Sequence, residues 1–266
     1  MAKLEVLLAT TDQSNFDKLE EMNIQSDIII ANQSDFSEIQ KTTKDGKNIT
    51  MISTTERGVG RNRNLAMLFS SGDICILADD DMRFDDDYTT IVEDAFENNP
   101  RADIIIFNID TIGDQSAKRR NNKKVKRIRI FNCLNYGAAR IAYRRESIEK
   151  VNLSFSLLFG GGCKYCSGED SLFLTSALRS GLKIYTFPKR LATVLQTSSS
   201  WFTGYNEKYF HDKGCWVAAA FRRTAYLWAF MLGIRFRKAN PKIRFPKILK
   251  LMFLGIRDFK KSTKRI

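Results

Sequence analysis

Apolar runs alternate with helical patterns over the first hundred residues. Continuous apolar runs occupy residues 4–9, 27–31 and 73–78, and residues 48–53 have a further strand pattern. Runs of this length without polar alternation are typical of strands buried on both faces of a parallel sheet. Helical patterns cover residues 14–23, 61–69 and 86–98, and residues 103–108 predict another strand. The alternation predicts an α/β fold with a Rossmann-like, mostly parallel sheet flanked by helices.

The pattern changes after residue 113. Residues 113–129 are polar and rich in lysine and arginine, which favours a solvated loop over an anion-binding segment. Residues 131–143 return to mixed, strand-like structure, and three glycines at 160–162 indicate a flexible or closely approached loop. A helix is predicted from residue 168 to about residue 179, and a last strand at residues 183–187.

Positive charge is concentrated at the C-terminal end. The chain carries a net charge of +13, and residues 216–266 hold fourteen Lys or Arg against the single acid Asp258, so the remainder is neutral. This division predicts a catalytic domain over residues 1–215 and a basic, aromatic-rich helical extension over residues 216–266. The uncharged run at residues 224–234 is too short to span a bilayer.

Residues 242–265 of this extension mix Ile, Leu, Met and Phe with lysines and arginines. Such a mixture predicts a basic amphipathic element that lies on an anionic membrane surface. A packed helical cap with a solvated end is the alternative. The N-terminus lacks the architecture of a signal peptide, which predicts a cytoplasmic protein, peripheral to the inner face of the cell membrane.

Cysteine usage gives little support for a disulfide framework or a zinc site. The five cysteines are an odd number at irregular spacing. Cys163 and Cys166 form a lone CxxC, and zinc would need two more ligands, for which Cys133, Cys215 and His211 are the candidates. Zinc or redox chemistry is therefore the weaker hypothesis.

Three consecutive carboxylates, Asp79-Asp80-Asp81, directly follow the predicted strand at residues 73–78. Ligands of open α/β sheets bind beyond the carboxyl ends of the strands. Adjacent carboxylates raise each other's pKa unless a cation compensates them. Mg²⁺ and Mn²⁺ sites use one or two carboxylates, with substrate phosphates and waters as further ligands. The position therefore favours a metal site over solvated acids that begin a loop.

Two glycine-containing turns precede predicted helices. Gly58-Val59-Gly60 allows a close backbone approach at a helix N-terminus, where phosphate is favoured, and Arg61 and Arg63 add positive charge there. At residues 168–170, Gly-Glu-Asp places two acids in the first turn of a helix. Acids at this position are commonly helix caps, but one of them could also be a general base that activates a hydroxyl.

These pieces, taken in order, resemble a known family. Thr10-Thr11 follows the first strand, Gly58-Val59-Gly60 precedes Arg63-Asn64, Ser71-Gly72-Asp73 leads into the aspartates, and Gly168-Glu169-Asp170 comes last. The combination resembles the family 2 glycosyltransferases of the GT-A fold over roughly residues 1–190. It looks most like bacterial enzymes that build capsular or exopolysaccharide repeat units.

The resemblance implies a role for each matching residue. Asp80 and Asp81 would bind Mn²⁺ or Mg²⁺, and Asp170 would be the catalytic base of an inverting transfer, with Glu169 supporting it or contacting the acceptor. The implied donor-binding residues are Thr10, Asp12, Asn32, Arg63, which would hold the nucleotide or its phosphates, and Asp79. His211 is a candidate further metal ligand, although its aromatic neighbours favour a structural role.

Two departures from the family pattern refine the expectation. Asn32-Gln33 follows the second strand, where family members often have an acid that reads the base, and Asp35 comes a little later. The Q-x-x-R-W pattern of processive synthases is absent, since no arginine precedes Trp201. The first departure counts against a uridine nucleotide, and the second favours transfer of a single sugar. The resemblance as a whole implies a hexosyltransferase-type enzyme that moves one sugar from a nucleotide-diphosphate sugar, with a UDP-sugar as the expected donor. The implied acceptor is a glycan or a polyprenyl-diphosphate-linked acceptor in cell-surface polysaccharide synthesis.

Two other classes of protein fit parts of the sequence. A nucleotidyltransferase acting on sugar phosphates would carry a glycine- and lysine-rich phosphate loop near the first strand, and residues 7–16 contain none. A non-enzymatic nucleic-acid-binding protein would explain the basic C-terminal segment. The neutral N-terminal part with its three aspartates argues against that class, so we expect no nucleic-acid partner.

Overall fold

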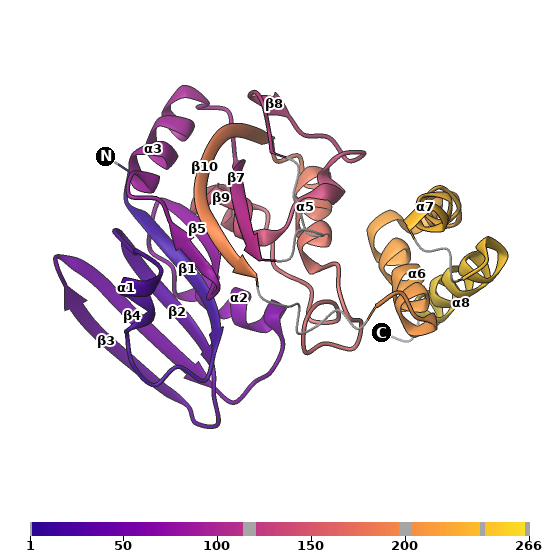
Figure 1. The fold of residues 1–266 in the computed structure, drawn as a ribbon, viewed down its shortest axis with the longest axis horizontal. Helices are drawn as coiled ribbons and strands as arrows, with labels where there is room; N and C mark the ends of the chain where they lie inside the picture. The colour runs from indigo at the N-terminus through magenta and orange to yellow at the C-terminus, as the bar shows by residue number, and fades with distance from the viewer. Residues whose placement is uncertain (1, 114–120, 197–203, 240–242, 264–266) are drawn as a thin grey trace.

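The computed structural model describes residues 2–113, 121–196, 204–239 and 243–263. Within them, one ten-stranded sheet has the order β3-β4-β2-β1-β5-β9-β7-β10-β6, with β8 paired to β10. Figure 1 shows this sheet and its helices over most of the molecule, with α6, α7 and α8 gathered beyond α5 at the other end.

The strands are β1 (Leu4–Thr11), β2 (Asp27–Gln33), β3 (Glu38–Lys44), β4 (Lys47–Thr54), β5 (Ile74–Asp79), β6 (Met82–Phe84), β7 (Ile104–Gly113), β8 (Lys126–Arg127), β9 (Ile141–Arg144) and β10 (Ile184–Gln196). The helices are α1 (Lys18–Glu21), α2 (Val59–Phe69), α3 (Tyr88–Asn98), α4 (Arg145–Lys150), α5 (Glu169–Arg179), α6 (Glu207–Phe221), α7 (Ala225–Ala239) and α8 (Phe245–Thr263). Short 3-10 turns lie at Cys133–Asn135, Ala138–Arg140 and Arg222–Thr224.

The central strands β4, β2, β1 and β5 run parallel, as the apolar runs predict. Successive side chains of a strand point to opposite faces of the sheet. Accordingly Leu8 of β1 packs into one core and Leu7 into the other, and both are buried. The predicted fold class is confirmed for this part of the sheet, and antiparallel strands complete it on both sides.

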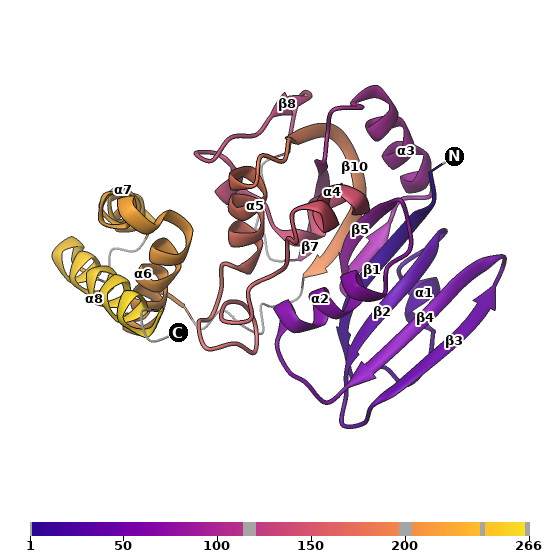
Figure 2. The same cartoon turned by 180° about the vertical axis from the view of Figure 1, so that it is seen from behind.

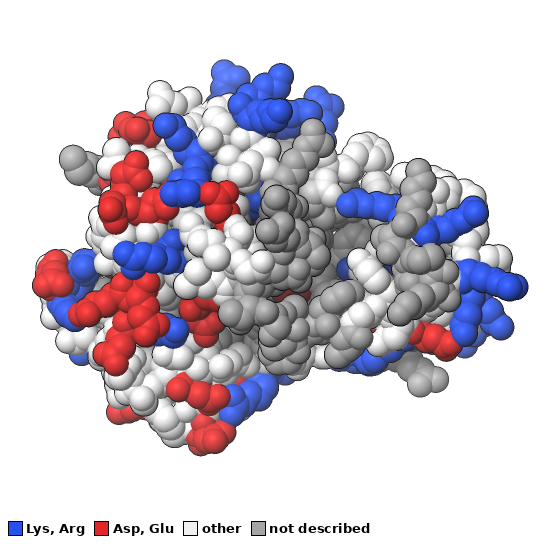
Figure 3. Space-filling view, in the orientation of Figure 1, with Lys and Arg blue, Asp and Glu red and all other residues white. Residues whose placement is uncertain are grey.

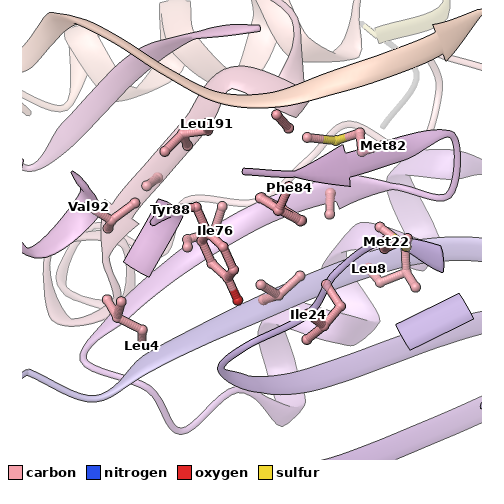
Figure 4. Packing of buried hydrophobic residues seen from close by; sticks show 14 of the residues in the cluster. Leu4, Leu8, Met22, Ile24, Ile76, Met82, Phe84, Tyr88, Val92 and Leu191 are labelled. Atoms are coloured by element: carbon pink, nitrogen blue, oxygen red, sulfur yellow. The ribbon is translucent and has the colours of Figure 1, made fainter. Parts of the chain in front are cut away.

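Helices cover both faces of the sheet. On one face, side chains of α1, α3 and β6 pack against β1 and β5, and Figure 4 shows Phe84 and Tyr88 near Ile76, and Leu8 near Met22. On the other face lie α2, α4 and α5, which Figure 2 shows from behind. These two buried clusters hold the carboxyl ends of β1 and β5 in fixed positions.

Three local elements differ from the prediction. The helix expected at residues 14–23 is reduced to the four residues of α1. Strand β3 was not predicted because it is an exposed, polar edge strand; its hairpin turns at Asp45-Gly46, both with positive φ. Strand β10 continues beyond Phe187, because a register shift between Thr186 and Arg190 carries it past Pro188.

Residues 113–129 and 131–143 also have more specific structure than expected. Residues 114–120 of the predicted loop lie outside the described residues. Lys126–Arg127 forms β8, a short strand on β10. In the second segment two 3-10 turns precede β9, which is inserted antiparallel between β5 and β7.

The basic C-terminal segment forms helices that pack on one another. Gly214 of α6 and Gly255 of α8 make the close contact: a Cβ at either glycine would lie 2.0 Å from a backbone oxygen of the other helix. The predicted boundary between residues 215 and 216 falls inside α6. The helical extension predicted from residue 216 onward is interrupted at Arg222, where φ is +35°.

Helix α8 buries the apolar stripe that predicted a membrane-lying element at residues 242–265. Ile248, Met252 and Ile256 are fully buried in the cluster that α6, α7 and α8 share. For α8 the structure therefore shows the alternative, a packed helical cap with charged residues outside. Among the described helices, none combines the length and the apolar character needed to cross a bilayer.

Candidate active site

The site is centred on Arg63, which lies on α2 and has only 5% of its side chain exposed. Its Nη2 lies 2.9 Å from Asp79 Oδ1, at the end of β5. Its Nη1 lies 2.7 Å from Asp170 Oδ1 and 3.4 Å from Glu169 Oε1, both in the first turn of α5. A buried charge is tolerated only when it is paired. Arg63 therefore joins the end of the parallel sheet to the start of α5.

Burial disfavours the charged form of Arg63, but Asp79, Asp170 and Glu169 outweigh burial and raise the pKa of its guanidinium above the ordinary value. The guanidinium carbon also lies 5.3 Å from the ring centroid of Phe155. The sequence predicts that Arg63 holds the nucleotide or its phosphates. In the structure its guanidinium lies against the carboxylates, and both Nη atoms donate hydrogen bonds to acids.

Glu169 and Asp170 both lie in the first turn of α5, and Glu169 is the more deeply buried of the two. Burial, followed by the negative charge of Asp170, raises the pKa of Glu169 to about 7, while Arg63 acts in the opposite direction. The Asp170 side chain is 25% exposed and that of Glu169 14%. A group with a pKa near the working pH is suited to proton transfer, which makes Glu169 a candidate for acid–base chemistry, while Asp170 is the more exposed of the two carboxyl groups.

The aspartates after β5 face the end of β1. Thr10 Oγ1 donates a hydrogen bond of 2.6 Å to Asp80 Oδ2, and the Thr10 carbonyl accepts one from the buried Asn62. Asp80 is half-buried and Asp81 exposed. Thr10 and Asp80 are thus brought together at the carboxyl ends of neighbouring parallel strands, where ligands of such sheets bind.

The aspartates after β5 fit a cation site that substrate phosphates and waters complete, and not one closed by protein ligands alone. Across the described ranges, no group of three or more His, Cys, Asp and Glu side chains is arranged to enclose a metal ion. Among these residues the structure therefore shows no cluster of protein ligands around Cys163 and Cys166 that would make a zinc site. Asp80 and Asp81 fit Mg²⁺ or Mn²⁺, which need one or two carboxylates when phosphates and waters complete the coordination.

The two predicted donor residues in the neighbouring loops differ in exposure. Asn32 is fully buried: its amide oxygen accepts from Gln13 N, and its nitrogen donates to Gln13 O and Ser53 Oγ. Asn32 therefore shapes the loop after β1. Asp12, in that loop, is exposed with φ +53° and lies 3.9 Å from Arg57.

His211 is placed on α6. Its Nε2 lies 3.2 Å from Asp258 Oδ2 of α8, and its Nδ1 lies 3.5 Å from the neighbouring Asp212. These contacts give His211 a part in joining α6 to α8. The structure thus brings it to Asp258, and not to the aspartates that follow β5.

The glycine-rich loop makes the close approach that its sequence predicts. Val59 N, at the start of α2, donates to Gly161 O over 3.0 Å. Gly160 has φ +112°, and a Cβ there would lie 2.6 Å from Val59 and 2.9 Å from the carboxyl carbon of Glu169. Only glycine fits between the start of α2 and Glu169.

Two residues of α6 also border the site: Trp216, which the predicted boundary places in the C-terminal extension, and Lys213, which precedes that boundary. Trp216 Nε1 donates to Gly168 O over 3.0 Å, and a Cβ at Gly168 would lie 2.3 Å from the indole ring. Lys213 Nζ lies 5.3 Å from the Trp216 ring centroid. Burial lowers the pKa of Lys213, and Cys166 and Glu169 oppose the shift. A contact between residues 48 positions apart has no signal in a single sequence.

Comparisons with known proteins agree with this fold. The model of glycosyl transferase family 2 matches residues 26–159, half of the chain. The chain belongs to glycosyltransferase family 2 and is a glycosyltransferase. No curated protein matches it by sequence.

Solved structures of S. aureus TarS are similar in fold. TarS 1–349 in complex with UDP-GlcNAc has a TM-score of 0.66 and 14% identity, over 98% of this chain and 81% of that one. TarS 1–349 with UDP has a TM-score of 0.62 and 12% identity, over 99% and 91%. In a third, longer TarS structure the match has a TM-score of 0.59 and 13% identity and spans 88% of this chain but only 43% of that one. Together with the family match, the likeness confirms the predicted GT-A fold.

Proposed function

We propose that this glycosyltransferase moves a single sugar from a nucleotide-diphosphate sugar, a UDP-sugar, to a glycan or polyprenyl-diphosphate-linked acceptor. The observation that carries the proposal is the buried Arg63, which joins Asp79 on the donor side to Asp170 on the acceptor side. The similar fold of TarS, solved with UDP-GlcNAc and with UDP, supports the choice of donor. Hexosyl transfer in cell-surface polysaccharide synthesis is the process we assign to it.

Asp80 and Asp81 are the residues that would hold Mn²⁺ or Mg²⁺. When bound, such a cation neutralises charge that develops on the diphosphate leaving group. Thr10 orients Asp80 through its 2.6 Å hydrogen bond. The exposed Asp12 lies in the neighbouring loop, where it can reach the nucleoside of the donor.

Asp170 accepts the proton of the acceptor hydroxyl. Its Oδ1 is fixed by Arg63 Nη1, which leaves Oδ2 for the hydroxyl, and it is the more exposed of the two acids of α5. Glu169, with a pKa of about 7, is partly ionised beside Asp170 near neutral pH, and it orients the acceptor. Attack from the face opposite the leaving group inverts the anomeric carbon.

Hydrolysis of a panel of nucleotide sugars, with and without Mn²⁺ or Mg²⁺, tests the proposal. Wild-type protein should cleave one donor in a metal-dependent manner, and Asp80→Asn should lose that activity. Asp87→Asn is the matched control, because Asp87 is an exposed aspartate close by in the sequence. If neither cleavage nor nucleotide-diphosphate binding occurred with metal present, the proposed donor would be wrong.

The C-terminal segment, residues 216–266, is the part that we propose contacts an anionic membrane surface on the cytoplasmic side. Its fourteen basic residues and single acid favour contact with negatively charged lipid headgroups. Contact there would bring the enzyme to a lipid-linked acceptor.

A further inference from the structure

Helix α7 exposes apolar side chains along one whole face. Tyr226, Leu227, Phe230, Met231 and Ile234 are between 44% and 60% exposed. Their spacing of one, four, five and eight residues places them on the same side of the helix. Scattered exposed apolar residues are normal on a protein surface, but a contiguous patch marks a site of interaction.

The opposite face of α7 carries small residues that pack against the rest of the protein. Ala225 and Ala229 are completely buried, and a Cβ at Gly233 would lie 2.8 Å from Leu249 of α8. On the exposed side, Phe253 of α8 continues the patch, with its ring 5.1 Å from that of Tyr226. The orientation of α7 is thus fixed by packing, and the outward apolar face is a property of the folded chain.

Exposed arginines flank this face at both ends of the helix. Arg222 and Arg223 directly precede α7, and Arg235 and Arg237 lie in its last turns. Within the described part of the chain these four arginines form no ion pair with an acid, and Asp258, the single acid of residues 216–266, lies beside His211 and Arg257. Figure 3 shows lysine and arginine gathered over this end of the molecule, while acids are concentrated on the other half.

The charges decide which partner suits the face. In a symmetric dimer built on this face, the arginines of one copy would lie close to arginines of the other, and their like charges would repel. An anionic bilayer offers negative headgroups to the arginines and an acyl boundary to the apolar side chains. The apolar stripe of α8 is buried within the protein, so among the apolar residues of that helix only Phe253 joins the exposed face.

We infer that the face formed by Tyr226, Leu227, Phe230, Met231 and Ile234 of α7, with Phe253 of α8, inserts into the interface of an anionic lipid bilayer. The arginines at residues 222, 223, 235 and 237 then contact lipid headgroups. The role of this contact, access to a lipid-linked acceptor, rests on the proposed function. The main membrane-contacting element is thus α7, and residues 242–265 contribute Phe253 alone.

Stacked aromatic rings connect this face to the catalytic turn. Trp228 of α7 stacks on Phe221 with ring centroids 4.0 Å apart, and Phe221 meets the edge of Trp216 at 5.9 Å. Trp216 in turn holds Gly168, the residue before Glu169. Docking of α7 would therefore also fix the direction in which the start of α5 faces the membrane.

Co-sedimentation of the full-length chain with vesicles, without donor or acceptor, tests the inference. Wild-type protein should bind vesicles that contain phosphatidylglycerol and should bind vesicles of phosphatidylcholine alone roughly tenfold less well. The double variant Phe230→Glu, Met231→Glu should lose binding by about tenfold or more, since charged side chains are excluded from the acyl boundary. The control Leu68→Glu, at a 78% exposed leucine on α2, should bind like the wild type.

Three results would overturn the inference: no binding of wild-type protein to anionic vesicles, unchanged binding of the double variant, or a wild-type dimer that the double variant abolishes. The last result would assign the face to a second copy of the chain. Should the double variant not fold, Leu227→Gln with Ile234→Gln is the milder test and should also weaken vesicle binding. Donor hydrolysis in vesicle-free solution should remain in all variants, which separates failure of this inference from failure of the proposed chemistry.

Discussion

Arg63 Nη1 lies 2.7 Å from Asp170 Oδ1, although the two residues are 107 positions apart in the chain. The same guanidinium holds Asp79 at 2.9 Å, so one buried cation fixes the acids of β5 and of α5. Arginine can do this because its planar fork presents several donors at fixed angles, whereas lysine offers a single flexible charge.

We therefore predict that Arg63→Lys lowers kcat by about a hundredfold, because misplaced catalytic groups lose most of their effect. Arg63→Met should also lower the free energy of unfolding by about 3–5 kcal/mol, since it leaves buried carboxylates without their partner. Urea unfolding and steady-state kinetics measure the two effects. Arg61→Lys is the control, as Arg61 is an exposed neighbour paired only with Glu56. Equal kcat for Arg63→Lys and the control would contradict the role given to Arg63.

Glu169 makes stability depend on pH. Its pKa is raised from 4.5 to about 7 in the folded protein, so between these values the folded state binds more protons than the unfolded state. The contribution of Glu169 to the free energy of unfolding is therefore largest below about pH 4.5. It falls by up to about 3 kcal/mol as the pH rises towards 7.

Glu169→Gln should remove this contribution, so the variant should gain stability over the wild type as the pH is raised from 5 to 8. Urea unfolding at the two pH values is the measurement, and Glu146→Gln, at an exposed glutamate, is the control. A difference between variant and wild type that did not change with pH would show that Glu169 is not held protonated by the fold.

Thr10 should tune the affinity for the cation through Asp80. Thr10→Val keeps the shape of the side chain but removes the 2.6 Å hydrogen bond. Loss of a bond that orients a metal ligand typically costs about 10–100-fold in affinity. Mn²⁺ titrations of UDP binding should show that loss for Thr10→Val, while Thr11→Val, at the exposed next residue, should behave as wild type. Identical titrations for the two variants would remove Asp80 from the metal site.

Trp216 links the C-terminal helices to the site. Trp216→Phe retains an aromatic ring but loses the hydrogen bond to Gly168 O, which should cost about 1 kcal/mol of stability. We expect kcat to fall several-fold with little change in KM, because the turn that carries Glu169 and Asp170 is displaced. Trp228→Phe, which preserves the stacking on Phe221, is the comparison. A loss of stability without a change in kcat would make Trp216 a structural residue only.

The sequence predicts those parts of the fold that local pattern determines. Buried parallel strands produce continuous apolar runs, and the glycines at 160–162 mark the approach of two backbones. The polar edge strand β3 has no such pattern, since neither of its faces is buried. The apolar stripe of α8 was visible, but periodicity cannot tell whether protein or lipid covers it; here α6 does.

The same limit applies to the site. The aspartates after β5 and the acids of α5 could be found because each group is contiguous in sequence. The side chains that orient them come from elsewhere: Arg63 pairs with acids 16, 106 and 107 positions away, and Trp216 bonds to a residue 48 positions away. Tertiary packing alone decides such pairs, so the ion pairs of Arg63 and the contribution of α6 required the structure.

The central claim is that Asp170 is the base of a metal-dependent, inverting sugar transfer. Its most direct test combines product analysis with donor binding for wild type and Asp170→Asn. With a cleavable UDP-sugar and Mn²⁺, the wild type should release UDP and give a product of inverted anomeric configuration by NMR. Asp170→Asn should bind UDP with unchanged Kd but lose turnover by at least about a hundredfold. Full turnover in Asp170→Asn, or a product of retained configuration, would contradict the account.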